Sequence, residues 1–184
     1  MIEIRIHGRG GQGAKTAANF LAMAAMEKGK QIQSFPEYGP ERAGAPMKAY
    51  TRISDKKIKT YAPVVSPDIV LVIDPTFIGN INVTEGIKQD GIMIVNSRET
   101  PDKVKEKTGF SGEVHTVDAS GIAISATGLN KPNVPMLGAL IKITDLIPVE
   151  SIEKLVRKKF TEKIGEEKTQ ATVEAINRAY KEVN

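Results

Sequence analysis

The first 35 residues carry two hydrophobic patterns in succession. Residues 2–6 place an apolar side chain at every second position, which predicts a β-strand. Residues 14–28 carry helix-forming side chains without a break, and Gly29 stands where a left-handed residue commonly ends a helix. Residues 31–35 return to a strand pattern. The chain therefore opens with a β-α-β unit, right-handed if its strands are parallel, in which a glycine-rich loop joins the first strand to the helix.

Prolines and glycines interrupt the pattern in residues 36–46, which contain three prolines and two glycines. Because proline lacks an amide hydrogen, it excludes both a helix and a central strand here, and we expect an ordered loop at the carboxyl end of the second strand. Residues 47–53 and 57–61 then show strand patterns on either side of a short polar segment. They predict an antiparallel hairpin, and hence a mixed sheet.

A continuous apolar run bounded by aspartates, residues 68–74, is typical of a strand that helices cover on both faces, and it predicts the central strand. Further strands and weaker helical segments follow it: strands at 91–96 and 113–118, helices at 83–88 and 101–107. The last third predicts three helices, at 135–146, 148–163 and 166–183, two of which open with proline at the tolerated first position.

Together these elements predict an α/β protein with a three-layer Rossmann-like fold. We expect a mostly parallel sheet with an antiparallel hairpin, and a helical C-terminal third. At 184 residues the chain is long enough for one good core, so we expect a single domain over residues 1–184, with the helices of residues 148–184 packing on it.

Composition excludes several classes of function. The 26 Lys and Arg against 22 Asp and Glu leave a net charge of only +4, and the basic residues are scattered rather than gathered in a stripe, so we expect no nucleic-acid binding. The longest apolar run, residues 20–26, is far shorter than the ~20 residues that a bilayer requires. We therefore expect a cytoplasmic protein without a membrane partner.

Metal and thiol chemistry are also unsupported by the residue types present. The chain has no cysteine and only two histidines, His7 and His115. It therefore has no thiolate ligands for an iron–sulfur cluster, no disulfide and no thiol nucleophile, and we expect no metal site in it.

The glycine loop resembles two phosphate-binding templates and departs from each. Gly8, Gly10 and Gly13 match G-x-G-x-x-G between a strand and a helix, but the acid that should follow the second strand in a dinucleotide site is Glu37, already inside the proline loop. The P-loop template needs a lysine directly after its last glycine, and here Ala14 intervenes.

The remaining hypothesis is that the loop amides and the helix N-terminus bind an anion, and that the neighbouring proline loop lies beside them. Candidate site residues are Gly8, Arg9, Gly10, Gly11, Gln12, Gly13, Glu37, Tyr38, Gly39, Glu41, Arg42 and Asn133. A tight turn without a ligand, and a Glu–Arg pair that only holds the proline loop, are the structural alternatives. For residues 133–139 the structural interpretation is favoured: Asn133 as a helix N-cap, and Gly138 for close helix packing. No catalytic residue is assigned.

Three segments carry a joint resemblance to a known family: "HGRGGQGAKTAANFLAMAA", "FPEYGPERAGAPMKAYTRI" and "NVPMLGAL". In this order and spacing they resemble the gamma subunit of 2-oxoacid:ferredoxin oxidoreductases, most closely the pyruvate:ferredoxin type. The likeness covers essentially the whole chain. Pyruvate, 2-oxoisovalerate and 2-oxoglutarate enzymes share this scaffold, so the resemblance implies the class of substrate.

The resemblance implies a multi-subunit enzyme that decarboxylates a 2-oxoacid on thiamine diphosphate, passes electrons through 4Fe–4S clusters to ferredoxin, and gives the acyl group to coenzyme A. Alpha, beta and delta subunits are the implied partners, and they hold the thiamine diphosphate and the clusters, so this chain binds no cofactor alone. We hypothesise that Arg9, the amides of residues 10–13 and Arg42 face the junction where substrate and coenzyme A meet the thiamine. There they either stabilise a phosphate of coenzyme A or dock against the catalytic subunits. Two other functions stay open: an independent NAD(P)-binding enzyme, and an assembly scaffold that binds nothing small.

Overall fold

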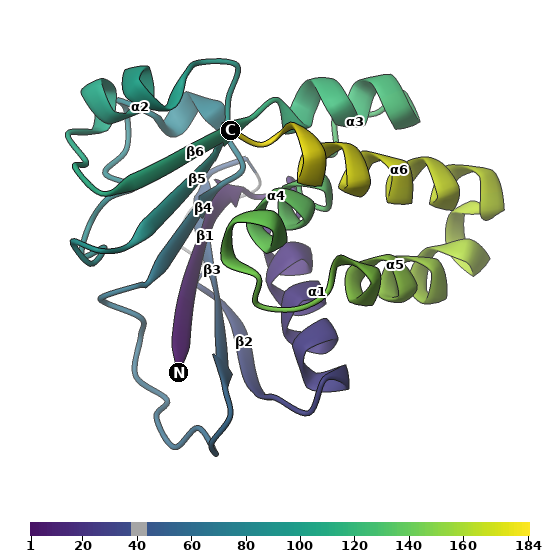
Figure 1. Ribbon diagram of the computed structural model, residues 1–184, viewed down its shortest axis with the longest axis horizontal. Coiled ribbons are helices and arrows are strands. Elements are labelled where there is room, and N and C mark those ends of the chain that lie inside the picture. Colours follow the sequence, from purple (N-terminus) through teal and green to yellow (C-terminus); the bar gives the residue numbers. More distant parts are fainter. Residues whose placement is uncertain (38–43) are drawn as a thin grey trace.

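A computed structural model describes residues 1–37 and 44–184 as a mixed sheet with helices on both faces (Figure 1). The strands are β1 (Ile2–Arg9), β2 (Gln31–Glu37), β3 (Pro46–Ser54), β4 (Ile69–Val72), β5 (Ile92–Asn96) and β6 (Glu113–Val117). The helices are α1 (Ala14–Glu27), the short 3₁₀ turn η1 (Pro75–Phe77), α2 (Pro101–Thr108), α3 (Ala119–Thr127), α4 (Pro135–Thr144), α5 (Val149–Ile164) and α6 (Glu166–Glu182). The α/β fold with a helical C-terminal part is thus confirmed.

The six strands of the sheet follow the order β2-β3-β1-β4-β5-β6. Strands β1, β4, β5 and β6 are parallel, whereas β3 runs antiparallel to both of its neighbours, β1 and β2. β4, a fully buried strand, lies inside the sheet, as its continuous apolar run predicted. The mixed character of the sheet is confirmed, but β3 separates the two strands of the opening β-α-β unit.

The prediction of an antiparallel hairpin formed by residues 47–53 and 57–61 is wrong in its second strand. Residues 57–61 form no strand, and β3 instead pairs with β2 on one side and β1 on the other. Both edges of β3 are therefore occupied, and no free edge is left for the residues that follow it. Two prolines fit this arrangement, because Pro36 lies in the edge strand β2 and Pro46 is the first residue of β3.

Two helical predictions also need correction. Residues 83–88 form turns and irregular backbone rather than a helix, and Val83 is buried in the smaller core with Ile87 packed against it. Helix α3 was not predicted, because its glycine, serines and β-branched residues give a weak helical pattern. Its start is fixed locally by Asp118, whose carboxylate accepts a hydrogen bond from the Gly121 amide at 2.8 Å.

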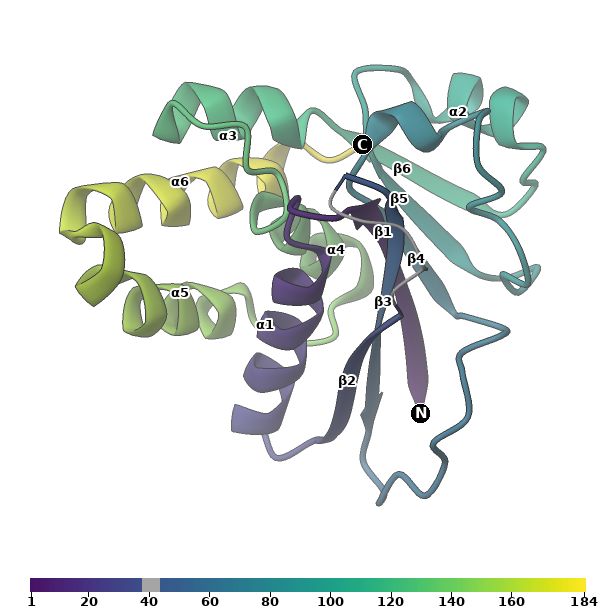
Figure 2. The ribbon, with the colours of Figure 1, turned by 180° about the vertical axis from the view of Figure 1, so that it is seen from behind.

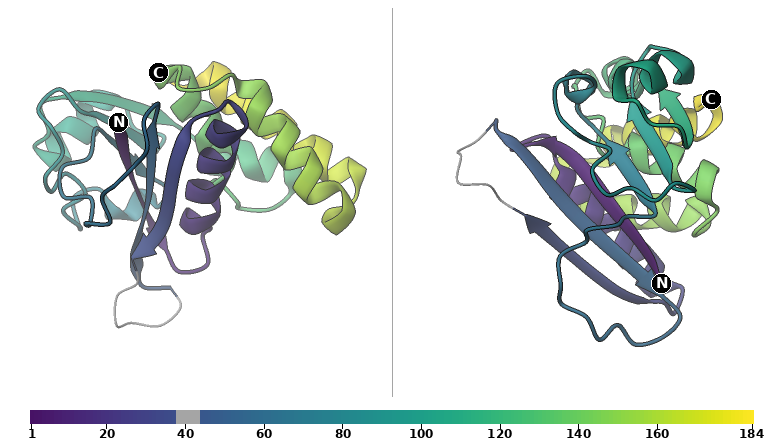
Figure 3. Two further views of the ribbon diagram at one scale, coloured as in Figure 1. Left: turned by 90° about the horizontal axis from the view of Figure 1, so that it is seen from below. Right: turned by 90° about the vertical axis from the view of Figure 1, so that its left-hand side faces the viewer.

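Two hydrophobic cores form on opposite faces of the sheet, because successive residues of a strand point to opposite sides. Ile69 and Leu71 of β4 face the larger core, which contains α1 and the C-terminal helices, while Val70 and Val72 face the smaller core under η1 and α2. Figures 2 and 3 show the larger group of helices gathered on one side of the sheet. The sheet is thus the middle layer of three.

The C-terminal helices join the larger core through a close approach of α4 and α6. A Cβ added at Gly138 would collide with the Ile176 carbonyl of α6, so the prediction that Gly138 allows close helix packing is confirmed. Leu155 of α5 and Ile176 of α6 belong to the same core cluster as α1. Within the described ranges, no helix is both long and apolar enough to cross a membrane.

Candidate functional site

The glycine loop lies at the carboxyl ends of the parallel strands, beside the point where the chain changes direction along the sheet. From β1 the chain passes through α1 to β2 at one edge, whereas β4, β5 and β6 continue toward the other edge. In open α/β sheets the crevice at such a reversal is the usual place for a ligand. Here it lies between the end of β1 and Asp74, the second residue beyond β4.

Two glycines give the loop its shape for different reasons. Gly11 and Gly13 have φ angles of +95° and +83°, which residues with a Cβ rarely adopt. At Gly13 an added Cβ would also lie 2.5 Å from Nδ2 of Asn133, whereas at Gly11 it would meet nothing within 4 Å. Gly13 is therefore required by a tertiary contact, and Gly11 only by the path of the backbone.

A hydrogen-bonded network fills the crevice between β1 and β4. Arg9 Nε and Gln12 Nε2 both donate to Oδ2 of Asp74, at 2.8 Å and 2.7 Å. Arg9 also donates to Thr76 Oγ1 at 2.9 Å, and its guanidinium lies 4.9 Å from the centre of the Phe77 ring. The arginine inside the loop thus has structural partners of its own.

Asp74 is the centre of this network, and only 3% of the residue is exposed. Burial alone would raise the pKa of its carboxyl, but hydrogen bonds from Thr76, Gln12 and Arg9 outweigh burial and hold that pKa below its usual value. Gln12 further stiffens the turn, because its Oε1 accepts a hydrogen bond from the Arg9 amide at 2.7 Å. The network therefore fixes the loop through an ionised carboxylate.

Asn133 contacts the other side of the loop, not the helix that follows it. Its Nδ2 donates to the Gly13 carbonyl at 3.4 Å, and the residue is 7% exposed. The N-cap of α4 is Val134, without a side-chain hydrogen bond, so the N-cap prediction for Asn133 is wrong. Pro135 opens α4 and has no amide hydrogen, which lowers the need for a cap there.

Glu37 ends β2 and lies away from the glycine loop. Its carboxylate accepts a short hydrogen bond from the Tyr50 hydroxyl, and burial, together with this bond and the charge of Glu37, raises the pKa of Tyr50. Because β3 lies between β2 and β1, Glu37 stands two strand spacings, roughly 10 Å, from the end of β1. The other candidates in the proline loop, Tyr38, Gly39, Glu41 and Arg42, lie outside the described residues, and their roles stay predictions.

His7 belongs to β1 and is separate from the loop. It is 2% exposed, and burial, with the charges of Arg5 and Lys48, lowers its pKa to about 3. The ring is therefore neutral at ordinary pH. In the part of the chain that the structure describes, no group of three or more His, Cys, Asp or Glu side chains is placed to hold a metal ion.

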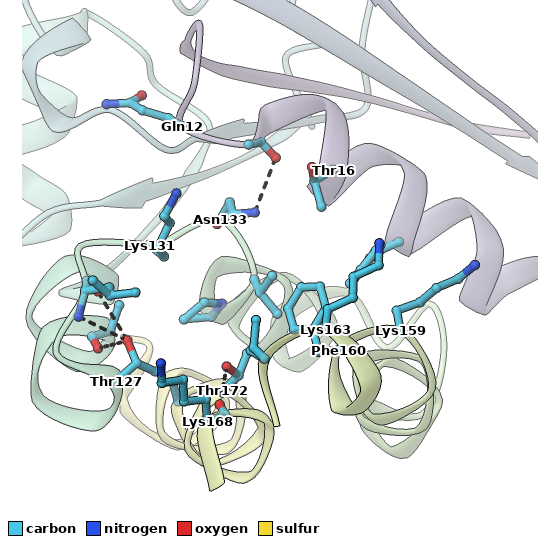
Figure 4. A pocket seen from close by; sticks show the side chains of 18 of the residues that line it. Gln12, Thr16, Thr127, Lys131, Asn133, Lys159, Phe160, Lys163, Lys168 and Thr172 are labelled. Carbon is cyan, nitrogen blue, oxygen red and sulfur yellow. Dashed lines mark hydrogen bonds between the residues drawn. The ribbon is translucent and has the colours of Figure 1, made fainter. Parts of the chain in front are cut away.

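A cavity of about 580 Å³ opens on the side of the loop opposite Arg9, between α1 and the C-terminal helices (Figure 4). Gly11, Gln12, Gly13 and Asn133 line one end of it. The remaining lining comes from α1, α3, α5, α6 and the segment that leads into α4, and it includes Lys131, Lys159, Lys163 and Lys168. Sequence reasoning missed these lysines, although the spacing of four residues between Lys159 and Lys163 places them on one face of α5.

The sheet order and the glycine loop define a protein of the Rossmann-like α/β class whose candidate site lies at the carboxyl edge of β1. Comparison with known proteins narrows this class. Residues 3–182 match the model of the family described as "Pyruvate ferredoxin/flavodoxin oxidoreductase".

Relatives match the chain over nearly its whole length. It is 48% identical over 181 residues to the pyruvate synthase subunit PorC of Thermotoga maritima, covering 98% of this chain and 94% of that protein. It is 46% identical to the common gamma subunit of the pyruvate/ketoisovalerate oxidoreductases of Thermococcus kodakarensis, with 97% of each chain covered. The crystal structure of the PORC subunit from Thermotoga maritima superposes with a TM-score of 0.90 at 45% identity, covering 100% of this chain and 97% of that one.

The chain therefore belongs to the pyruvate ferredoxin/flavodoxin oxidoreductase family, in which it is a gamma-type subunit of a multi-subunit oxidoreductase. The resemblance predicted from the three sequence segments is confirmed.

Proposed function

We propose that this chain is the gamma subunit of an enzyme that converts pyruvate, or a closely related 2-oxoacid, to an acyl-coenzyme A with ferredoxin as electron acceptor. The observation that carries the proposal is the full-length identity of 48% with a pyruvate synthase subunit. In the overall reaction the bond between the carboxyl carbon and the oxo carbon breaks, CO₂ leaves, two electrons pass to ferredoxin, and the acyl carbon forms a thioester with coenzyme A.

The cofactors of that reaction belong to the partner subunits in this proposal. Iron–sulfur clusters are held by cysteine thiolates, and this chain has no cysteine, so its residues do not fit a cluster. Alpha, beta and delta subunits supply the thiamine diphosphate, the clusters and the contact with ferredoxin. The gamma-type chain is then inactive alone and completes the shared site.

Its own contribution is the glycine loop edge. The Gly10 and Gln12 amides already donate to the carbonyls of Ala45 and Arg9, at 2.9 Å and 3.0 Å. The amides of Gly11 and Gly13 and the N-terminus of α1 carry the partial positive charge that favours a phosphate of coenzyme A. No side chain caps α1, whose N-cap is Gly13, so that end of the helix is not already neutralised by a side-chain hydrogen bond. Arg9, held by Asp74, keeps the loop in place beside that end.

An independent NAD(P)-dependent enzyme is disfavoured by the sheet order. In a dinucleotide site the acid that holds the ribose ends the strand next to the glycine loop. Here that neighbour is the antiparallel strand β3, and Glu37 is engaged by Tyr50 at the far edge. The position that would bind the ribose therefore has no acid in the expected place.

Native purification of the tagged chain, followed by identification of its companions, tests the assignment. We expect a brown complex with iron–sulfur absorbance that reduces ferredoxin only when both a 2-oxoacid and coenzyme A are present. The complex prepared without this chain should lose that activity. A chain that purifies alone and colourless, and that reduces NAD, would overturn the proposal.

Variants of the complex separate the coenzyme A role from a scaffold role. We expect Arg42→Gln to raise the KM for coenzyme A while the purified complex keeps its subunit composition. Arg178→Gln, a substitution on α6 away from the loop, serves as the control. Loss of assembly without a change in KM in the remaining complex would favour a scaffold, and an unchanged KM with intact assembly would remove Arg42 from the site.

A further inference from the structure

The connection between β3 and β4, residues 55–67, forms a strap across one face of the sheet. It contains no helix or strand, and connections of this length without secondary structure are uncommon in compact domains. Helix α1 packs against β2 and β3 on the opposite face, while α2 packs against β6 at the far end of the sheet. Figure 1 and the right-hand view of Figure 3 show the strap on the side of the sheet away from α1. The strap, rather than a helix, therefore covers this part of the sheet.

Side chains of the sheet hold the strap in place. Arg52 on β3 donates a hydrogen bond to the Ala62 carbonyl at 2.7 Å, and Gln33 on β2 donates to the Thr60 carbonyl at 2.8 Å. Val64 is buried and anchors the middle of the strap. These contacts fix the backbone path of the first two thirds of the strap.

A neighbouring turn fixes the rest of the strap. A Cβ added at Gly86 would collide with the Val65 carbonyl oxygen, so the turn and the strap are in close contact. The Lys88 amide also donates to the Pro67 carbonyl at 3.3 Å. Because the strap is held along its length in the isolated chain, little conformational entropy is left to lose when a partner binds it.

The fixed strap presents apolar side chains to solvent. Tyr61 is 90% exposed and Val65 is 75% exposed, the two highest values among the large hydrophobic side chains of the described residues. Ala62 and Pro63, which lie between them in the sequence, are exposed as well. Single exposed apolar residues are ordinary, but a contiguous apolar group on a fixed segment is typical of a surface that a partner covers. Tyrosine is also enriched at the centres of protein interfaces.

Lysines without an ion pair precede this apolar group. Lys56, Lys57 and Lys59 are exposed and form no ion pair with the described residues, whereas Asp55 pairs with Lys30. If two copies of the chain met through the strap about a twofold axis, these cations would repel one another. A complementary surface therefore has an apolar centre with carboxylates around it, and this charge pattern disfavours a second copy of the chain.

We propose that the strap docks another subunit of the same oxidoreductase, on a surface with an apolar centre and an acidic rim. Tyr61 and Val65 enter the apolar centre, and the lysines pair with the rim. The strap begins at the amino ends of the parallel strands, next to Ile2, so this interface is separate from the glycine loop at the carboxyl ends. The inference rests on the proposed function for the presence of partner subunits, and not for the reaction that they catalyse.

Dilution of the purified complex, followed by native mass spectrometry, measures how tightly this chain is held. The strap variant is Tyr61→Ala with Val65→Ser, and the matched control is Met26→Ala with Ile124→Ser, two exposed apolar residues of α1 and α3. We expect the strap variant to raise the Kd of this chain for the rest of the complex about tenfold or more, as truncation of an interface hot spot does. The control variant should dissociate like the parent protein.

A charge-reversal variant, Lys56→Glu with Lys57→Glu, tests the acidic rim. We expect it to weaken the association as well, and the parent complex to dissociate more readily as salt is raised. The side chains replaced in the strap are exposed, so both variants of the isolated chain should keep the circular dichroism spectrum and the unfolding midpoint of the parent protein. A weaker association then reports the interface and not misfolding.

Other occupants of the strap give different results. A dimer of the isolated chain in sedimentation that the strap variant abolishes would assign the strap to a second copy. Binding to phosphatidylglycerol vesicles that the same variant abolishes would assign it to a lipid surface, and either result would overturn the proposal. An unchanged Kd in the strap variant, or a control that dissociates as readily, would also overturn it and would leave the proposed reaction intact. A chain that purifies without companions would overturn both.

Discussion

The two sides of the glycine loop differ in how their charges are satisfied. On one side Arg9 is bound by Asp74, Thr76 and the Phe77 ring, and the carboxylate it meets is almost completely buried. On the other side four exposed lysines surround an apolar cavity without an acid in its lining. A paired charge stabilises the fold, whereas unpaired charges at a cavity remain available to a ligand. This difference shows that an arginine inside a glycine loop does not by itself predict an anion-binding site, because its guanidinium can be bound by side chains of the same protein.

The largest expected effect concerns His7, whose ring is buried in β1 next to Arg5 and apart from both sides of the loop. Its pKa is about 3 in the folded protein, against the ordinary histidine value of 6.5, so the unfolded chain binds a proton between these pH values and the folded chain does not. Stability should therefore rise with pH across this window and be lost as pH falls through it, by on the order of 4 kcal/mol.

Urea unfolding of His7→Gln between pH 3.5 and 7 (roughly the window of that titration) should show a flatter pH dependence than the parent protein. His115→Gln is the matched control, because His115 is the other histidine of the chain and stands on β6. Identical slopes for His7→Gln and the parent protein would contradict the buried neutral ring.

The next-largest expected change in stability tests the hydrogen-bonded network around Asp74. Replacing it by alanine leaves Arg9 and Gln12 without their shared acceptor, and we expect a loss of about 3 kcal/mol in the free energy of unfolding. The Arg9 side chain is 38% exposed, so solvent screens part of the ion pair and the hydrogen bonds carry most of this loss.

Because the pKa of Asp74 is lowered on folding, its stabilisation is present above its unfolded pKa and is lost as pH falls through the lower folded value. The stability difference between the parent protein and Asp74→Asn should therefore shrink in strong acid, as followed by circular dichroism. Asp55→Ala, at an exposed ion pair with Lys30, should leave the midpoint of unfolding nearly unchanged, because solvent screens that pair. Equal effects at the two aspartates would refute the difference between them.

A smaller change in stability should distinguish Gly11 from Gly13, the two loop glycines with positive φ angles. Gly13→Ala should cost about 2 kcal/mol, because the new Cβ meets Asn133 in a strained backbone conformation. Gly11→Ala has the backbone strain without the collision and should cost about 1 kcal/mol. Chemical denaturation of both variants measures the difference, and a larger loss at Gly11 would show that the contact with Asn133 is unimportant.

The smallest expected change in stability concerns the lysines that line the cavity. Lys163→Ala should change the free energy of unfolding by less than about 0.5 kcal/mol, since an exposed cation without an ion pair contributes little to folding. Thermal unfolding in low salt measures it. A loss as large as that of Asp74→Ala would mean that the lysines hold the fold together, and the comparison between the two sides would fail.

Local patterns predicted most of the elements. Strands β1, β4, β5 and β6 and helices α1, α2, α4, α5 and α6 lie within a few residues of their expected positions. Two predictions failed for another reason. Residues 57–61 alternate like a strand, but both edges of β3, their predicted partner, are already occupied. Helix α3 forms although its residues favour a helix only weakly. In both cases the neighbours of the segment in space, and not its own propensity, decide the outcome.

For the site, the sequence located the glycine loop and, through three joined segments, the family. It did not predict that Arg9 would form a hydrogen-bonded ion pair with Asp74, 65 residues away. Nor did it predict that Asn133 would contact Gly13, 120 residues away. The lysines of the cavity carried no signal beyond a spacing on one helix face, because a lysine on a helix surface is ordinary until the opposing surface is known.

The sequence by itself determined where the backbone turns, which faces of its strands and helices are apolar, and that no cysteine is present to bind a cluster, because these properties reside in single residues and their spacing. Only the tertiary structure decided that β3 enters between β1 and β2, and which cations are neutralised. Strand order and charge pairing depend on contacts between residues far apart in the chain, and such contacts leave no periodic pattern in either segment.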